Sequence, residues 1–219
     1  AWVNAIQFYV DLLNDYGPPG ASSNGFNENL ALFSRGNCAM WVDATSAAGK
    51  LYDGNESDVA DSLGFAPAPV AETPKGSHWL WSWALAIPAS SENQEAALEF
   101  ITWATSQEYI ELVGETEGWT SVPPGTREST YANEQYTEAA PFADFVLKAI
   151  QDADPTDSTL EPNPYVGVQF VGIPEFQSIG TQVGQTIAAA LTGDTTVEQA
   201  LDSAQRATER TMQRAGYLD

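Results

Sequence analysis

Three tryptophans alternate with smaller residues in the stretch HWLWSWALAIPASS, which runs from His78 to Ser91. In an extended backbone with a period of two, Trp79, Trp81 and Trp83 share one face. An indole face can pack against the C–H face of a carbohydrate, whose hydroxyl groups are then bound by polar neighbours. Core packing or a cross-strand aromatic ladder would explain the same three indoles, so both interpretations stay open.

Two further tryptophans stand beside polar turns. Trp41 lies in the apolar segment CAMWV and is followed within four residues by Asp43 and Thr45, and Trp119 precedes the polar loop TSVPPGTREST. A strand, a polar turn and a helix start together can place backbone N–H groups and short polar side chains at a ligand. Helix capping alone would also explain Asp43 and Thr45. The grouping of indoles with polar turns predicts a pocket for a sugar-like ligand.

Residues for catalysis or metal binding are sparse. His78 is the only histidine, and the sequence has no phosphate-binding loop, dinucleotide fingerprint, GxSxG or HExxH motif. The segment from Asp53 begins like a calcium loop, but Asp58 stands where that loop needs glycine, so we interpret it as a solvated loop. We therefore expect no cofactor, no metal and no enzymatic activity.

Three alternatives remain to a protein that only binds and releases its ligand. The carboxylate pair of a glycosidase is defined by its separation in space, so a carbohydrate-active enzyme stays open. A carbohydrate-binding module and a purely structural interaction module are the others. Turnover of a glycoside would identify the enzyme, and saturable binding of a free polyol without turnover would favour the binding protein.

The composition excludes several partners. The 219 residues include 8 Lys and Arg against 30 Asp and Glu, a formal net charge of −22, so a nucleic-acid backbone would be repelled. No apolar run approaches the roughly 18 residues of a membrane-spanning helix, so the chain is not expected to insert into a membrane. The single cysteine, Cys38, cannot form a disulfide within the chain and is expected to lie buried in a strand.

Local patterns predict the elements that would position these residues. A first helix carries Trp2, Ile6, Tyr9 and Leu13 on one face and is ended by GPPG at 17–20. Because it has no start signal, we expect a truncated chain. Short strands are predicted at Cys38–Val42 and Ala84–Ile87, the second one buried on both sides.

Further helices are predicted towards the C-terminus. One runs from Ser91 to Val113 and opens with a capping box at Ser91–Gln94. Others cover Phe142–Ile150 and Glu175–Leu191, and a last one follows a capping box at Thr195–Glu198. Two glycines one turn apart, Gly180 and Gly184, would let another backbone approach closely. Helices joined to a few short strands predict an α/β architecture.

Several segments carry a family resemblance. In order they are FSRGNCAMWVDATSAAG, GSHWLWSWALAIPASSENQEAALEFITWATS, GWTSVPPGTREST, VGIPEFQSIGTQVGQTIAAALTG and the closing ERTMQRAGY. The sequence resembles the family 1 extracellular solute-binding proteins of ABC importers, most closely the sugar-alcohol (sorbitol or mannitol) type. The resemblance extends over nearly the whole chain in colinear order.

The resemblance implies a helix-rich C-terminal lobe of a periplasmic-binding-protein type II fold, present as a fragment that lacks most of the N-terminal lobe. Residues 1–90 and 114–219 would form the C-terminal lobe. Residues 91–113 would form a helix that packs on the N-terminal lobe in the family. The two lobes close over a sugar or polyol, and the closed form is presented to the permease subunits of the importer. The location implied is periplasmic or extracellular and membrane-associated.

The resemblance and the residue chemistry together give the candidate ligand-binding residues. Trp41 and Trp81 are expected as stacking faces and Asp43 as an acceptor for adjacent hydroxyl groups. Arg127 is expected to donate to a ligand oxygen or to brace its loop. Thr45, Trp83 and Trp119 complete the set, although Trp83, like Trp79, also suits packing.

Overall fold

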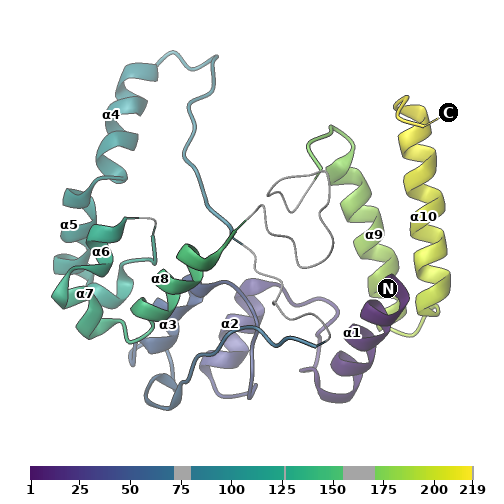
Figure 1. Ribbon diagram of the computed structural model, residues 1–219, viewed down its shortest axis with the longest axis horizontal. Coiled ribbons are helices and arrows are strands. Elements are labelled where there is room, and N and C mark those ends of the chain that lie inside the picture. The colour runs from purple at the N-terminus through teal and green to yellow at the C-terminus, as the bar shows by residue number, and fades with distance from the viewer. Residues whose placement is uncertain (72–79, 126, 155–170, 219) are drawn as a thin grey trace. The chain divides into compact units, whose positions relative to one another are not determined.

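The computed structural model describes residues 1–71, 80–125, 127–154 and 171–218. His78 and Trp79, two residues of the tryptophan-rich stretch, therefore lie outside the described residues. The chain divides into two units (Figure 1). Unit 1 combines Ala1–Glu28 with Val168–Asp219, and unit 2 is Asn29–Gly167.

Unit 1 is built from three helices, α1 (Trp2–Tyr16), α9 (Phe176–Leu191) and α10 (Val197–Arg214). The last two lie side by side (Figure 1) and α1 packs against both. Their shared core consists mainly of small and aliphatic side chains: Val10, Ala190, Leu191, Val197 and Ala200. Alanines on one face of α10 allow close helix packing. The three helices confirm the periodicity seen in the sequence.

Two details of unit 1 differ from the prediction. On α1, Ile6 and Leu13 pack against the core as predicted, but Val10 is the buried residue and Trp2 and Tyr9 are exposed, so only part of the predicted face points inward. The capping box of α10 forms one residue later than predicted. The Thr196 hydroxyl accepts a hydrogen bond from the Gln199 amide at 3.2 Å, and Gln199 Oε1 accepts one from the Thr196 amide at 3.3 Å.

The two glycines of α9 do not have the role predicted for them. A Cβ atom built at Gly180 or at Gly184 would meet no atom of the described chain within 4 Å. The expected close approach of another backbone is therefore absent among the described residues. Both positions tolerate a small side chain in the space that the structure shows.

Unit 2 contains short helices around an aromatic core. The elements are α2 (Phe26–Ser34), which crosses from unit 1, η1 (Thr45–Ala47), α3 (Ala48–Tyr52), η2 (Ala60–Ser62), α4 (Gln94–Ala104), α5 (Gln107–Glu117), η3 (Trp119–Ser121), α6 (Glu128–Tyr131), α7 (Glu134–Ala139) and α8 (Ala143–Asp152). The η elements are single 3-10 turns. The core consists of Val122, Tyr131, Tyr136, Ala140, Phe142, Ala143 and Val146. Helix α8 confirms the helix predicted at Phe142–Ile150.

The predicted strands at Cys38–Val42 and Ala84–Ile87 are wrong for the described residues, none of which forms a β-strand. Both segments are irregular, and Met40, Val42 and Leu85 are exposed. Cys38 is half-buried, not enclosed in a strand. A strand exists only where a neighbour supplies backbone hydrogen bonds, and none of the described segments pairs with these two.

The helix predicted from Ser91 to Val113 is two helices. It breaks after Ala104, because the Ser106 hydroxyl accepts a hydrogen bond from the Tyr109 amide at 3.1 Å and starts α5. The capping box predicted at Ser91–Gln94 does not form either. Helix α4 begins at Gln94 behind Asn93, whose side chain makes no capping bond, and the Gln94 side chain instead donates to the Ala89 carbonyl at 2.9 Å.

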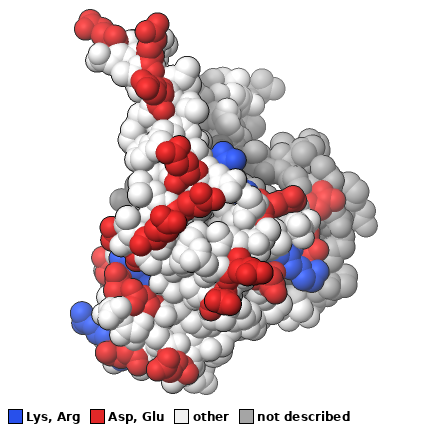
Figure 2. Space-filling model, turned by 90° about the vertical axis from the view of Figure 1, so that its left-hand side faces the viewer, with Lys and Arg blue, Asp and Glu red and all other residues white. Residues whose placement is uncertain are grey.

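Acidic side chains outnumber basic ones on the visible surface. Figure 2 shows many Asp and Glu side chains and few Lys and Arg on the face that it presents. Two ion pairs join described residues, Lys50 with Glu56 and Lys148 with Asp152, and their side chains are exposed. Exposed pairs of this kind contribute little to stability. Within the described ranges, no helix is long and apolar enough to cross a bilayer.

Candidate ligand-binding site

All of the predicted ligand-binding residues belong to unit 2. The first group, Asp43 and Thr45, lies where the chain enters η1. The Asp43 carboxylate accepts a hydrogen bond from the Ala44 amide at 2.7 Å, and Asp43 is exposed. Thr45 is the first residue of η1, which begins behind Ala44 without a side-chain cap. Helix capping is therefore not what these two side chains do, and the second carboxylate oxygen of Asp43 can accept further hydrogen bonds.

Trp41 lies next to this segment and is half-buried. Its ring centroid is 6.1 Å from that of Phe33 on α2, with the ring planes at 45°. Contacts of this kind between aromatic rings prefer tilted geometries, and they restrict the rotation of the indole. The side chain is thus partly held in place and partly accessible.

Helix α3 connects the Asp43–Thr45 segment to the loop that carries Trp119. It follows η1 directly and packs on η3. The approach is close at Gly49, where an added Cβ would lie 2.4 Å from the Thr120 carbonyl oxygen. Only glycine allows this contact without a shift of the backbone. The structure thus packs α3, the helix that follows the Asp43–Thr45 segment, against η3, the element that begins with Trp119.

Trp119 is half-buried and packs against the aromatic core of unit 2. Its indole lies over Gly114 of α5, where an added Cβ would be 2.6 Å from indole Cδ2. Much of one indole face is therefore used in packing. The remaining surface of the ring is what a ligand could contact.

Arg127 braces its loop, one of the two roles expected from the sequence. Its Nε donates a hydrogen bond to the Thr105 carbonyl at 2.9 Å, at the C-terminal end of α4. A guanidinium stabilises the carbonyls and the negative dipole end of a helix at this position. The same loop is tied by the Tyr131 hydroxyl, which donates to the Gly125 carbonyl at 2.8 Å. Burial raises the pKa of Tyr131 and keeps this donor protonated.

Trp81 and Trp83 form a pair on the irregular segment before α4. Their ring centroids are 5.6 Å apart and the planes meet at 74°. This edge-to-face geometry agrees with the predicted placement of alternate indoles on one side. Trp83 is 87% exposed and Trp81 is 46% exposed, so the core-packing interpretation does not hold for either in the described chain. The aromatic partner of Trp83 is Trp81, and the described contacts do not bring Trp83 to the α3–η3 junction.

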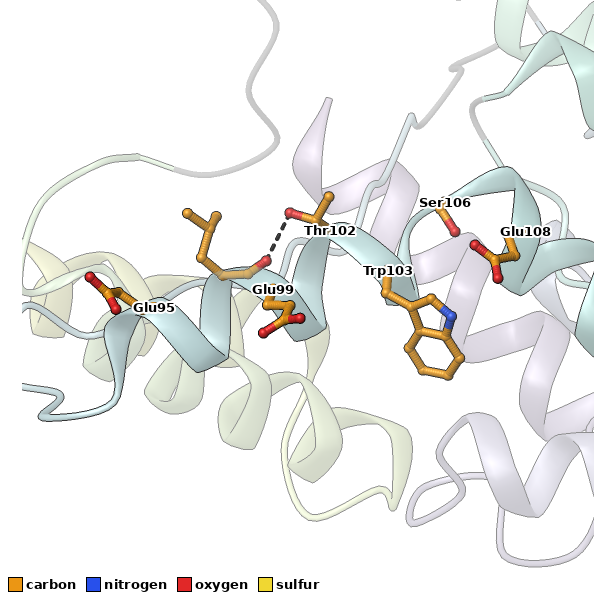
Figure 3. A pocket seen from close by; sticks show the side chains of 7 residues that line it. Glu95, Glu99, Thr102, Trp103, Ser106 and Glu108 are labelled. Carbon is orange, nitrogen blue, oxygen red and sulfur yellow. Dashed lines mark hydrogen bonds between the residues drawn. The ribbon is translucent and has the colours of Figure 1, made fainter.

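A hollow on α4 and α5 lies outside the predicted site and was not expected from the sequence. It has a volume of about 540 Å³ and is lined by Glu95, Leu98, Glu99, Thr102, Trp103, Ser106 and Glu108 (Figure 3). The Trp103 ring meets Tyr109 edge-on, with centroids 4.7 Å apart. No group of three metal-binding side chains is arranged for an ion among the described residues. The helical spacing of these residues is the signal that could have identified the hollow.

Comparison with known proteins relates the chain to binding proteins of transporters. It is 59% identical over 216 residues to a mannitol-binding protein of Pseudomonas aeruginosa, covering 99% of this chain and 49% of that protein. It is also 59% identical to a solute-binding protein of an ABC transporter from Agrobacterium vitis S4. That crystal structure holds D-mannitol, and the TM-score is 0.93 over 100% of this chain and 52% of the other.

A more distant structure supports the fold alone. The solute-binding protein of Agrobacterium radiobacter K84, solved in complex with ribitol, shares 24% identity with a TM-score of 0.78 over 95% of this chain. The chain spans about half the length of the relatives it matches. The profile of the bacterial extracellular solute-binding proteins matches residues 1–111. The chain therefore belongs to the family of bacterial extracellular solute-binding proteins.

Proposed function

We propose that this chain forms part of the ligand cleft of a receptor for a sugar alcohol of the mannitol class. The observation that carries the proposal is 59% identity across the chain to two proteins, one named for mannitol binding and one crystallised with D-mannitol. In the full-length protein, the receptor delivers its ligand to the permease of an ABC importer in the periplasm or at the outer face of the membrane. It performs no chemistry on the ligand.

The residues of unit 2 suit an uncharged polyol. Asp43 has a carboxylate oxygen that can accept hydrogen bonds from adjacent hydroxyl groups, and Thr45 can donate or accept. Trp41, Trp81, Trp83 and Trp119 offer apolar ring surface for the C–H groups of the chain. Arg127 is tied to the end of α4 through its hydrogen bond to the Thr105 carbonyl, and its guanidinium retains further N–H donors. These assignments are proposals for this chain.

We further propose that residues 91–113 pack against the part of the receptor that this chain does not span. Leu98, Phe100 and Trp103 of α4 are exposed by 59%, 58% and 40%. Apolar side chains that gather on one helix in this way are usually covered by a partner surface. In this scheme the hollow beside Trp103 is part of that contact surface and not the polyol site.

Binding drives transport through a change of conformation. The polyol contacts both halves of the receptor in the closed form, so it binds that form more tightly and raises its population. The permease then distinguishes the closed form from the open form. A ligand that contacts one half alone should shift this equilibrium little, because only a difference in affinity between the two forms can shift it.

The test uses a chimera in which residues 1–219 replace the matching 49% of the Pseudomonas aeruginosa protein. Isothermal titration with D-mannitol, D-sorbitol, ribitol, D-glucose and maltose measures affinity and selectivity, and the 219-residue chain alone is titrated in parallel. We expect saturable binding of a hexitol by the chimera and much weaker binding by the chain alone. Asp43→Ala should weaken binding, whereas Asp61→Ala, an exposed carboxylate on η2, should not.

Two results would overturn the proposal. Saturation by maltose and none of the polyols would assign an oligosaccharide ligand instead. Release of a product during incubation with glycosides, followed by chromatography, would identify an enzyme.

A further inference from the structure

Two glycines, one on α3 and one on α5, lie against η3, the element that carries Trp119. Gly114 of α5 lies beneath the indole, where three ring atoms would be 2.6 to 2.7 Å from an added Cβ. Gly49 of α3 lies against the Thr120 carbonyl, 2.4 Å from the position of a Cβ. Non-bonded carbon atoms normally approach to about 3.5–4.0 Å, so neither position accepts a methyl group without a shift.

The two contacts differ in what would have to move. At Gly114 the obstacle is a side chain, and the indole can be displaced by rotation about its side-chain torsions. At Gly49 the obstacle is a backbone carbonyl, so η3 itself would have to shift. Gly114 is buried, and its backbone is helical and needs no glycine for its torsion angles. Inside a helix, glycine lowers stability by roughly 1 kcal/mol relative to alanine. The packing of the Trp119 ring on Gly114 is therefore the physical reason that favours glycine at this position.

We infer that Gly114 and Gly49 are positioning residues that set the depth and orientation of the Trp119 indole at the polyol site. This inference rests on the proposed function and deepens it. Gly114 lets the indole seat against α5 and the aromatic core, which leaves a defined part of the ring exposed. Gly49 fixes the register between η3 and α3, which follows the Asp43–Thr45 segment. Together the two glycines set the spacing between the Trp119 ring and the Asp43 carboxylate.

The test measures the D-mannitol affinity of the chimera with Gly114→Ala and Gly49→Ala. We expect each substitution to raise the Kd for D-mannitol by about tenfold, the factor that corresponds to 1.4 kcal/mol. Matched controls are Gly180→Ala and Gly184→Ala, which are helical glycines with open space around them, and these should leave Kd unchanged. Thermal unfolding of each variant separates a loss of fold from a loss of affinity.

A double-mutant cycle distinguishes positioning from a general structural effect. If Gly114 acts through the indole, Gly114→Ala combined with Trp119→Ala should bind no more weakly than Trp119→Ala alone. Trp119→Phe provides a smaller ring, so Gly114→Ala should cost less in that background than beside tryptophan. Fully additive losses in both backgrounds would overturn the inference.

The outcomes for the two proposals are separable. An unmutated chimera that binds no polyol contradicts the proposed function itself. A chimera that binds D-mannitol and keeps its Kd with Trp119→Ala contradicts only the role of Trp119 and its two glycines. A loss with Trp119→Ala but none with Gly114→Ala or Gly49→Ala contradicts the positioning role alone.

Discussion

The two units of the molecule have cores of different kinds. The core of unit 1 is aliphatic and small, with Ala190, Leu191 and Ala200 between three helices. The core of unit 2 is aromatic, with Tyr131, Tyr136 and Phe142 among short helices and turns. In unit 1, regular helices can approach closely because the buried side chains are small. In unit 2, large rings fill irregular space between short elements, and Trp119 of the candidate site packs against them.

Truncation of the aromatic core should have the largest effect on stability. Phe142 is 2% exposed and its ring lies 5.4 Å from that of Tyr52. Phe142→Ala should lower the free energy of unfolding by about 4 kcal/mol, measured by urea denaturation. Phe8→Ala, which truncates a 68% exposed ring on α1, is the control and should cost much less. Equal losses for the two variants would contradict the assignment of this core.

The corresponding change in unit 1 should be smaller. Leu191 is 7% exposed and belongs to the aliphatic core, so Leu191→Ala should cost about 3 kcal/mol in the same denaturation experiment. Leu12→Ala on the exposed side of α1 serves as the control. If Leu191→Ala proved more damaging than Phe142→Ala, the ranking of the two cores would be reversed.

Substitutions at helix caps should also distinguish the two units, with smaller losses of stability than the core truncations. Thr196 caps α10 through a complete capping box, whereas Asn93 stands before α4 without a side-chain capping bond. Thr196→Ala should therefore cost about 1 kcal/mol. Asn93→Ala should stay within roughly 0.5 kcal/mol, as is usual for a surface change without a lost contact. Chemical denaturation of both variants measures the two losses of stability. A larger loss for Asn93→Ala than for Thr196→Ala would contradict the prediction.

A gain in stability of similar size is expected at a buried hydroxyl. Tyr136 is fully buried, and its hydroxyl has no hydrogen-bond partner among the described residues. Tyr136→Phe should raise the free energy of unfolding by about 1 kcal/mol, because it removes an unsatisfied polar group. If Tyr136→Phe instead lowered the free energy of unfolding, the hydroxyl would have to be hydrogen-bonded in solution.

The same residue predicts a dependence on alkaline pH. Burial, followed by the charge of Tyr131, raises the pKa of Tyr136 above its usual value near 10. The folded protein then holds a proton that the unfolded chain releases, so this contribution to stability is present below pH about 10 and falls as the pH rises further. Tyr136→Phe should show a shallower decline of stability above pH 10 in denaturation curves.

The contrast between the units also explains what could be predicted from the sequence. Helices α1, α9 and α10 follow from periodicity and from breakers such as Gly17, because these signals are local. The strands predicted at Cys38–Val42 and Ala84–Ile87 depend on partners that a linear pattern cannot supply. The break at Ser106 was overlooked because the apolar stripe continues across it, although a serine followed by a new helical turn was a usable signal.

The candidate site was predicted in part. Residue types identified the Asp43–Thr45 segment and Trp119 as separate candidates, and the meeting of α3 with η3 became visible only from the contact at Gly49. Arg127 was expected either to bind ligand or to brace its loop, and its bond to Thr105 shows the bracing role. The position of the ligand among these residues stays a prediction.

The most direct test of the account is ¹⁹F NMR of the chimera labelled with 5-fluorotryptophan, with and without D-mannitol. Single Trp→Phe variants assign the resonances. We expect the resonances of Trp41 and Trp119 in unit 2 to shift on saturation, while that of Trp2, which lies on α1 in unit 1, stays in place. Shifts of Trp2 alone, or none at Trp41 and Trp119 while calorimetry shows binding, would contradict a polyol site on unit 2.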